Sequence, residues 1–229
     1  MDLTPEPRFL HGFTPLAAPR PERRHVREHT DEGPERRLAG WLYQSVPAVL
    51  GVLVLSWGVL LNNVTAHAHP VRMLAWTLLL LIAGLAVGAL WRALRTGRPL
   101  GTLAEWTDAH RSSLWVLGFA WGAAAFLVVP HMAASAPVFA WFLVPLGGFA
   151  MAVPCSADLR SAIAASLPPL LMTLVGLAFK GTAMLPVALA VGGAGALSAA
   201  LIWTVHRLVR ERAEAAVRLG PAPALFTRT

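Results

Sequence analysis

The sequence predicts an all-α membrane protein, a bundle of about six transmembrane helices with both termini in the cytoplasm. Of the 229 residues, 56% are hydrophobic and 14% are charged, and the mean hydropathy is +0.58. Soluble globular domains carry fewer apolar and more charged residues. After residue 37, most of the chain consists of apolar runs of about 17 to 24 residues, each long enough to cross roughly 30 Å of hydrocarbon.

The first segment, residues 1–37, combines several prolines with arginines and acidic residues. Such a segment buries too little apolar surface to offset the entropy of ordering, so it is predicted to be a disordered cytoplasmic tail. It is not a cleavable signal peptide, because no apolar stretch follows the start within the usual distance. The last segment, 220–229, is predicted to be a second flexible tail.

The predicted transmembrane domain covers residues 38–205. Its spans are placed at 38–61, 71–91, 113–130, 137–153, 161–179 and 184–205. The separation between the third and fourth spans is the weakest, and Pro130 and Pro137 bracket small residues where the chain must turn.

The distribution of basic residues predicts the orientation. With the N-terminus inside, 17 of the 19 basic residues fall on the cytoplasmic side, and only Arg72 and Lys180 fall outside. Because positive residues resist translocation, this asymmetry favours six spans with cytoplasmic termini. Arginine replaces lysine almost everywhere, as in proteins from GC-rich bacterial genomes, so we expect a bacterial inner membrane. Topology and anionic headgroups explain the net charge of +7, and no nucleic-acid partner is expected.

Small residues and prolines predict how the helices pack. Three pairs have the spacing of close helix contacts in lipid: Gly84 with Gly88, Gly118 with Gly122, and Gly192 with Ala196. Four prolines inside spans are expected to bend or interrupt their helices at buried or hydrated sites: Pro47, Pro145, Pro168 and Pro169.

Tryptophans near the predicted span ends are interpreted as interfacial anchors, because an indole faces both acyl chains and water. These are Trp41, Trp57, Trp76, Trp91, Trp115, Trp141 and Trp203.

The sequence lacks any complete catalytic, nucleotide-binding or metal-binding motif, so neither an enzyme nor a cofactor is predicted. No Asp, Glu, Lys or Arg lies well inside a span. Proton pumps, ion-coupled transporters and intramembrane hydrolases usually need such groups at depth, so the sequence argues against these classes. The single cysteine, Cys155, is expected to be a free buried thiol. Asp158 lies between the fourth and fifth spans, where we expect it to cap a helix rather than to act in catalysis.

Three histidines, His67, His69 and His131, fall on the predicted outer side. His67 and His69 alternate along an extended loop and so point the same way, and His131 lies in a neighbouring turn. Three interpretations stay open: a zinc or copper site, a pH-responsive site, or loop residues without a ligand.

The last span runs without a break into a predicted juxtamembrane helix over 206–219. Val205, Leu208, Arg212 and Leu219 recur at three-to-four spacing, as at the start of a coiled coil. The alternative is a helix whose arginines reach back to the lipid headgroups.

The order of features resembles that of the N-terminal multi-span sensor regions of bacterial membrane-bound histidine kinases and diguanylate cyclases. The resemblance covers residues 71–218 and rests on the segments 117–122, 126–130 and 161–171, a Gly147-Gly148 helix and an Arg/Glu-rich final segment. It implies that the last helix leads toward an output domain. The sequence contains no kinase core, no Gly-Gly-Asp-Glu-Phe motif and no nucleotide loop.

Two functions follow as expectations. The first is a non-enzymatic membrane module that senses a signal and passes it on through the helix at 205–219, to a membrane or cytoplasmic protein or to a second copy of the chain. The second is a membrane subunit of a larger assembly, such as an ABC-type permease or an accessory subunit of an energy-transducing complex.

Overall fold

The computed structural model describes residues 41–64, 68–96, 103–131 and 138–218, and every regular element within these ranges is helical. All four ranges belong to the compact unit formed by residues 33–229. The predicted all-α class is therefore confirmed. The two predicted tails, 1–37 and 220–229, lie outside the described residues.

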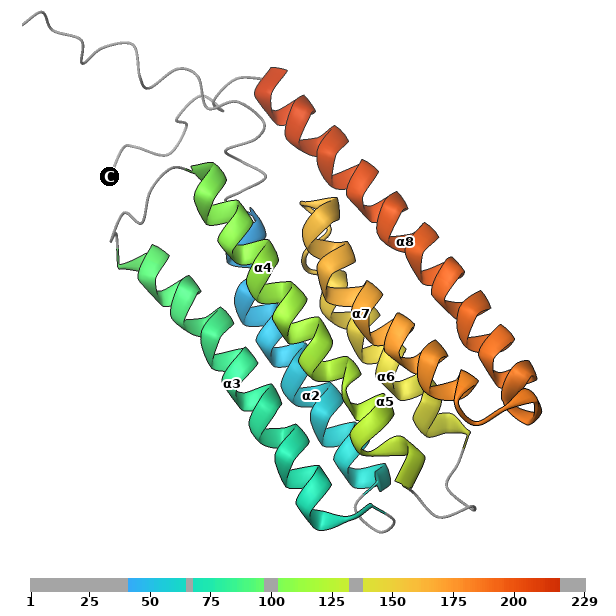
Figure 1. The fold of residues 1–229 in the computed structure, drawn as a ribbon. Coiled ribbons are helices and arrows are strands. Elements are labelled where there is room, and N and C mark those ends of the chain that lie inside the picture. Colours follow the sequence, from blue (N-terminus) through green and yellow to red (C-terminus); the bar gives the residue numbers. More distant parts are fainter. Residues whose placement is uncertain (1–40, 65–67, 97–102, 132–137, 219–229) are drawn as a thin grey trace, which may run out of the picture. The chain divides into compact units, whose positions relative to one another are not determined.

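Six long helices follow the predicted spans (Figure 1). They are α2 (Val46–Val64), α3 (Pro70–Arg95), α4 (Leu103–Gly122), α6 (Phe139–Ala152), α7 (Leu159–Ala178) and α8 (Leu185–Arg218). Residues 41–44 add a helical turn before α2, and α4 is followed by the short α5 (Ala124–Leu127) and the 3₁₀ turn η2 (Val129–His131). Another 3₁₀ turn, η3 (Thr182–Met184), leads into α8.

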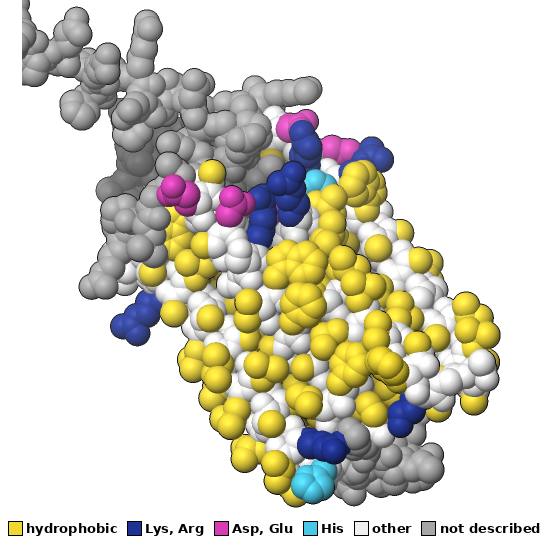
Figure 2. Space-filling model, in the orientation of Figure 1, with side chains coloured by type: hydrophobic (Ala, Val, Ile, Leu, Met, Phe, Trp, Pro, Cys, Tyr) yellow, Lys and Arg dark blue, Asp and Glu magenta, His cyan; other side chains and the backbone are white. Residues whose placement is uncertain are grey.

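Four helical stretches in the described residues are long and apolar enough to cross a membrane. These are Trp41–Asn63, Pro70–Ala93, Leu159–Ala178 and Thr182–Ala215. On the face shown in Figure 2, hydrophobic side chains cover the surface between two zones of charged side chains. Both observations indicate a membrane protein.

The third and fourth predicted spans are helical, but neither is a long apolar helix. Helix α4 begins with charged residues that include Glu105 and Asp108, and its apolar part stops at the turn of Ala123 before α5. Helix α6 has 14 residues, about 21 Å at roughly 1.5 Å per residue, which is shorter than the hydrocarbon core. The count of six spans therefore stays a proposal.

Helix α7 is the centre of the packing, because its interfaces with α4 and α6 are the most extensive in the unit. Pro168 and Pro169 are buried and lie within α7, which continues through them without interruption. Proline has no N–H, so the carbonyls of Ala164 and Ala165 lose their helical donors. A Cβ atom on Gly118 of α4 would lie 2.7 Å from the Ala164 oxygen, so only glycine allows the two backbones to approach this closely.

Helix α6 also contains a proline and closely packed glycines. The helix continues through the buried Pro145, and a Cβ atom on Gly148 would lie 2.7 Å from Cγ of Pro169. The expected interruption of α6 and α7 is therefore absent. In α7, Gly118 of α4 packs onto the carbonyl of Ala164, which Pro168 leaves without a helical donor. Pro47 differs: it is exposed and follows a turn at Ser45 that separates residues 41–44 from α2.

The predicted small-residue pairs differ in what they contact. A Cβ atom on Gly122 would lie 2.8 Å from Sδ of Met172, so Gly118 and Gly122 both lie against α7. Gly84 and Gly88 of α3 lie at ordinary contact distance from Leu53 and Leu50 of α2. The predicted contact of Gly192 and Ala196 is not made within the described unit, because Gly192 faces open space and Ala196 is exposed. The close glycine of α8 is Gly195, which lies against Leu170.

Two of the predicted tryptophan anchors are core residues instead. Trp76 is 0% exposed, and its indole donates to the carbonyl of Ala120 over 3.0 Å. Trp141 is 6% exposed and lies against Gly176 of α7. The interpretation as anchors is wrong for these two. The Trp76 indole is stable inside the protein because its N–H bonds a backbone carbonyl, and Trp141 fits because Gly176 leaves room for its ring. Trp41, Trp115 and Trp203 are exposed.

Candidate functional site

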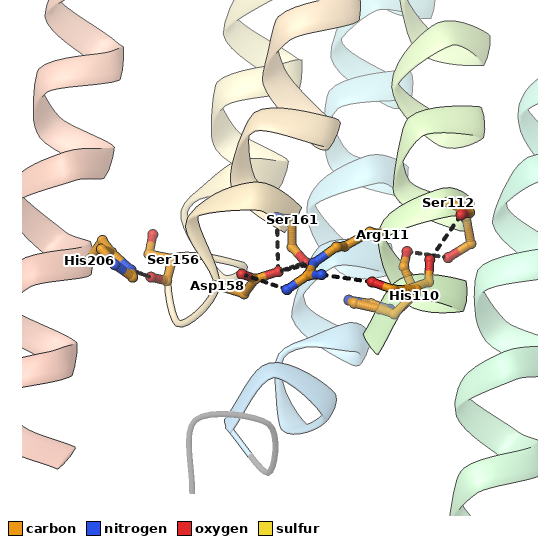
Figure 3. A network of polar contacts seen from close by, with 9 residues as sticks. His110, Arg111, Ser112, Ser156, Asp158, Ser161 and His206 are labelled. Carbon is orange, nitrogen blue, oxygen red and sulfur yellow. Dashed lines mark hydrogen bonds and ion pairs between the residues drawn. The ribbon is translucent and has the colours of Figure 1, made fainter. Parts of the chain in front are cut away.

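Polar side chains from four parts of the chain meet at the end of the unit where α4 and α7 begin (Figure 3). We call this the polar end cluster, and it comprises Tyr43, His110, Arg111, Ser156, Asp158, Ser161 and His206. Tyr43 precedes α2, His110 and Arg111 belong to α4, and His206 belongs to α8. The other members lie in the α6–α7 connection or in the first turn of α7.

Asp158 is the centre of the polar end cluster and the N-cap of α7. Its backbone is extended, with φ −121° and ψ 111°, and its carboxylate accepts the N–H of Ser161 over 3.1 Å and the Ser161 hydroxyl over 2.7 Å. The predicted capping role is confirmed, since these bonds satisfy a donor that the first helical turn leaves without a partner.

Arg111 forms a two-pronged ion pair with the same carboxylate. Its Nε lies 2.7 Å from Oδ2 of Asp158, and one terminal nitrogen lies 3.2 Å from Oδ1. The other terminal nitrogen contacts Asp108 over 2.7 Å. Burial alone would raise the pKa of Asp158, but the bonds from Arg111 and Ser161 outweigh it and lower this pKa below its usual value.

His110 is a buried histidine next to this ion pair. It is 1% exposed, its Nε2 has no hydrogen-bond partner among the described residues, and its ring centroid lies 5.9 Å from that of Tyr43. Burial lowers its pKa to about 4, against the opposing influence of Asp158, so the ring is neutral near pH 7.

His206 connects α8 to the polar end cluster. Its Nδ1 lies 2.8 Å from the carbonyl oxygen of Ser156, so the tautomer with a proton on Nδ1 donates a hydrogen bond to the α6–α7 connection. Ile202 is 4% exposed and Val209 packs against the core, so the face of α8 that carries Ile202, His206 and Val209 lies against the rest of the unit.

The chemistry of this arrangement favours holding helices together over catalysis. Cys155 is free and fully buried, as predicted, and burial raises its pKa to about 12, which disfavours the reactive thiolate. The Ser161 hydroxyl donates to a carboxylate that Arg111 also holds, and the lowered pKa of Asp158 makes it a poor base.

The predicted outer-side site stays a prediction. His67 lies outside the described residues, His69 is exposed, and His131 ends η2 with a side chain that is not described. Among the residues that the structure describes, no group of three or more histidine, cysteine, aspartate or glutamate side chains is arranged to hold a metal ion.

The predicted coiled-coil stripe of Val205, Leu208, Arg212 and Leu219 has two residues on the outer side of α8. Leu208 is 54% exposed, Arg212 is also exposed, and Val205 is half-buried. Leu219 lies outside the described residues. Leu208 and Arg212 are therefore turned away from the face that packs on the unit.

Comparison with known proteins adds no relative: no protein family, no curated protein and no solved structure matches this chain.

Proposed function

We propose that this chain is a non-enzymatic module of a bacterial inner membrane that transmits changes in its helical unit to a protein partner through the end of α8. The observation that carries the proposal is the contact between His206 and the α6–α7 connection. It joins the C-terminal half of α8 to the cluster in which α4 and α7 are held together.

The length of α8 supports this role. At roughly 1.5 Å per residue its 34 residues extend about 51 Å, well beyond roughly 30 Å of hydrocarbon. Past His206 the helix carries two exposed ion pairs at i,i+4 spacing, Arg207 with Glu211 and Arg210 with Glu214. Such pairs support a helix in water, so the segment is suited to project from the membrane toward a partner.

The α6–α7 connection contacts both α8 and α4 and so links these two helices. Ser156 accepts from His206, Asp158 follows two residues later, and Arg111 binds Asp158 from α4. A shift of α4 relative to α7 would therefore act on the connection that holds α8. The stripe of Leu208 and Arg212 on the outer face is the surface offered to the partner.

A fusion experiment tests the proposal. Residues 1–218 are joined to the catalytic core of a reporter kinase, and one to four alanines are inserted after Arg218 to rotate the output domain by about 100° per residue. Kinase output that varies with helix phase supports transmission through α8. Output that is the same for all insertions contradicts it.

The alternative, a subunit of a larger assembly, predicts a different result on purification. Isolation from native membranes in mild detergent should then yield a stoichiometric ATPase or electron-transfer partner. The coupling proposal instead predicts an isolated module or a complex with a signalling protein or a second copy.

A further inference from the structure

An apolar groove lies between α2 and α3. Its volume is about 510 Å³, within the range of roughly 300–1,000 Å³ that is typical of ligand sites. Leu50, Leu53 and Trp57 line it from α2, and Thr77, Leu81 and Gly84 line it from α3. The lack of a side chain at Gly84 leaves space beside Leu53.

The side chains that line the groove are almost entirely apolar. The Trp57 indole N–H points to the Thr77 hydroxyl at 3.4 Å, so the polar groups of these two lining residues face each other. Both helices belong to the four stretches that are long and apolar enough to cross a membrane. The medium around the groove is then lipid, and an acyl chain matches its lining.

The same face of α3 ends in a positive charge. Steps of three or four residues lead from Gly84 through Gly88 and Trp91 to Arg95. The Arg95 guanidinium lies over the Trp91 ring, 5.1 Å from its centroid. Arg92 and Arg95 are exposed and form no ion pair with any residue that the structure describes. Gly84 and Arg95 are about 16 Å apart along the helix, at roughly 1.5 Å per residue.

We infer that the groove holds an acyl chain of an acidic phospholipid, with the lipid phosphate beside Arg95. The apolar lining selects the chain, and Arg95, which pairs with no acidic residue that the structure describes, selects the negative headgroup. This inference requires a membrane location but not the coupling role of α8, so either can fail without the other.

Two variants fill the groove. Gly84→Leu adds a side chain inside it, where a Cβ atom meets Leu53 at an ordinary 3.4 Å, and Leu85→Trp enlarges a lining residue that is 63% exposed and has room to move. Gly58→Leu is the matched control, because Gly58 is exposed on α2 and a Cβ atom there meets nothing within 4 Å. Arg95→Gln removes the charge, and Arg160→Gln is its control on an exposed arginine at the start of α7.

Native mass spectrometry of the full chain tests the inference, with equal amounts of dioleoyl phosphatidylglycerol and dioleoyl phosphatidylcholine added in detergent. Wild type should retain phosphatidylglycerol over phosphatidylcholine by about fivefold, the effect of one arginine near an anionic headgroup. Arg95→Gln should bring the ratio close to one, and the filled variants should lose both lipids while Gly58→Leu and Arg160→Gln behave as wild type. Circular dichroism checks that each variant is folded. Equal retention of the two lipids by wild type overturns the inference. So does undiminished binding by both filled variants, or a lipid-free dimer that filling the groove dissociates.

Discussion

At the scale of single residues, Asp158 has two separable roles. It caps α7 through Ser161 and forms an ion pair with Arg111, whose side chain is 24% exposed. Asp158→Asn keeps a capping oxygen and removes the charge, so we expect a loss of about 1–3 kcal/mol in the free energy of unfolding. Asp158→Ala should cost about 1 kcal/mol more, because the cap is lost as well. Thermal or denaturant unfolding in detergent measures both values.

Arg160→Ala is the matched control for these variants, since Arg160 is exposed and forms no ion pair with a described residue. It should change the unfolding free energy by less than about 0.5 kcal/mol. Equal stability of Asp158→Asn and wild type would show that the ion pair contributes nothing.

His110 should make the fold sensitive to mild acid. Burial lowers its pKa from 6.5 to about 4. Between these two pH values the histidine is protonated in the unfolded chain and neutral in the folded chain. The stabilisation is complete above pH 6.5 and is lost as the pH falls toward 4, by up to roughly 3 kcal/mol. His110→Phe should remove this part of the pH dependence, as measured by melting temperatures at pH 7.5 and pH 5. A pH profile identical to wild type, with His69→Phe as the control, would contradict this role.

Of the seven members of the polar end cluster, the sequence predicts the role of one, Asp158. The capping role of Asp158 was predictable because a cap depends on residues next to it in the chain. Its partner Arg111 is 47 residues away, and the contact of His206 with Ser156 spans 50 residues. Pairs at such separations depend on which helices are neighbours, and apolar runs carry no information on that.

At the scale of helices, we expect substitutions of glycine by alanine to differ sharply in their effect on stability. Gly118→Ala places a Cβ atom 2.7 Å from the backbone oxygen of Ala164, so α4 and α7 must separate. We expect a loss of about 1–3 kcal/mol in unfolding free energy. Gly192→Ala meets nothing within 4 Å and should be neutral or slightly stabilising. Unfolding curves of the two variants decide this, and equal stability would contradict the central packing of α7.

The positions of the helices were predictable from apolar runs, but their orientation about their axes was not. In lipid, inward and outward faces are both apolar, so hydropathy does not separate them. This is why Gly192 was assigned to a contact that Gly195 makes, and why Trp76 was interpreted as an anchor. The four-residue spacing of Gly118 and Gly122 does predict their contact face, since a Cβ atom on either would lie within 2.8 Å of an atom of α7.

At the scale of the whole molecule, the number of spans is open to a direct test. Single cysteines are introduced at Thr96, Ser135 and Thr182 in a Cys155→Ala background, and intact cells are treated with an impermeant maleimide. Six spans with the N-terminus inside place Ser135 and Thr182 outside and Thr96 inside. Four spans, without the third and fourth segments, would leave Ser135 inside. Labelling of Thr182 alone would therefore contradict six spans, while Thr96 and Thr182 serve as controls under both counts.

The proposed coupling assigns the link between the C-terminal half of α8 and the polar end cluster to the hydrogen bond between His206 and the Ser156 carbonyl. Spin labels at Ser112 of α4 and Glu211 of α8, both exposed, report the distance between the two helices in a Cys155→Ala background. With His206 present, pulsed electron paramagnetic resonance should give one narrow distance distribution. His206→Phe should broaden or shift that distribution, whereas His69→Phe should not. An unchanged distribution in His206→Phe would contradict the claim that this contact fixes the C-terminal half of α8 on the polar end cluster.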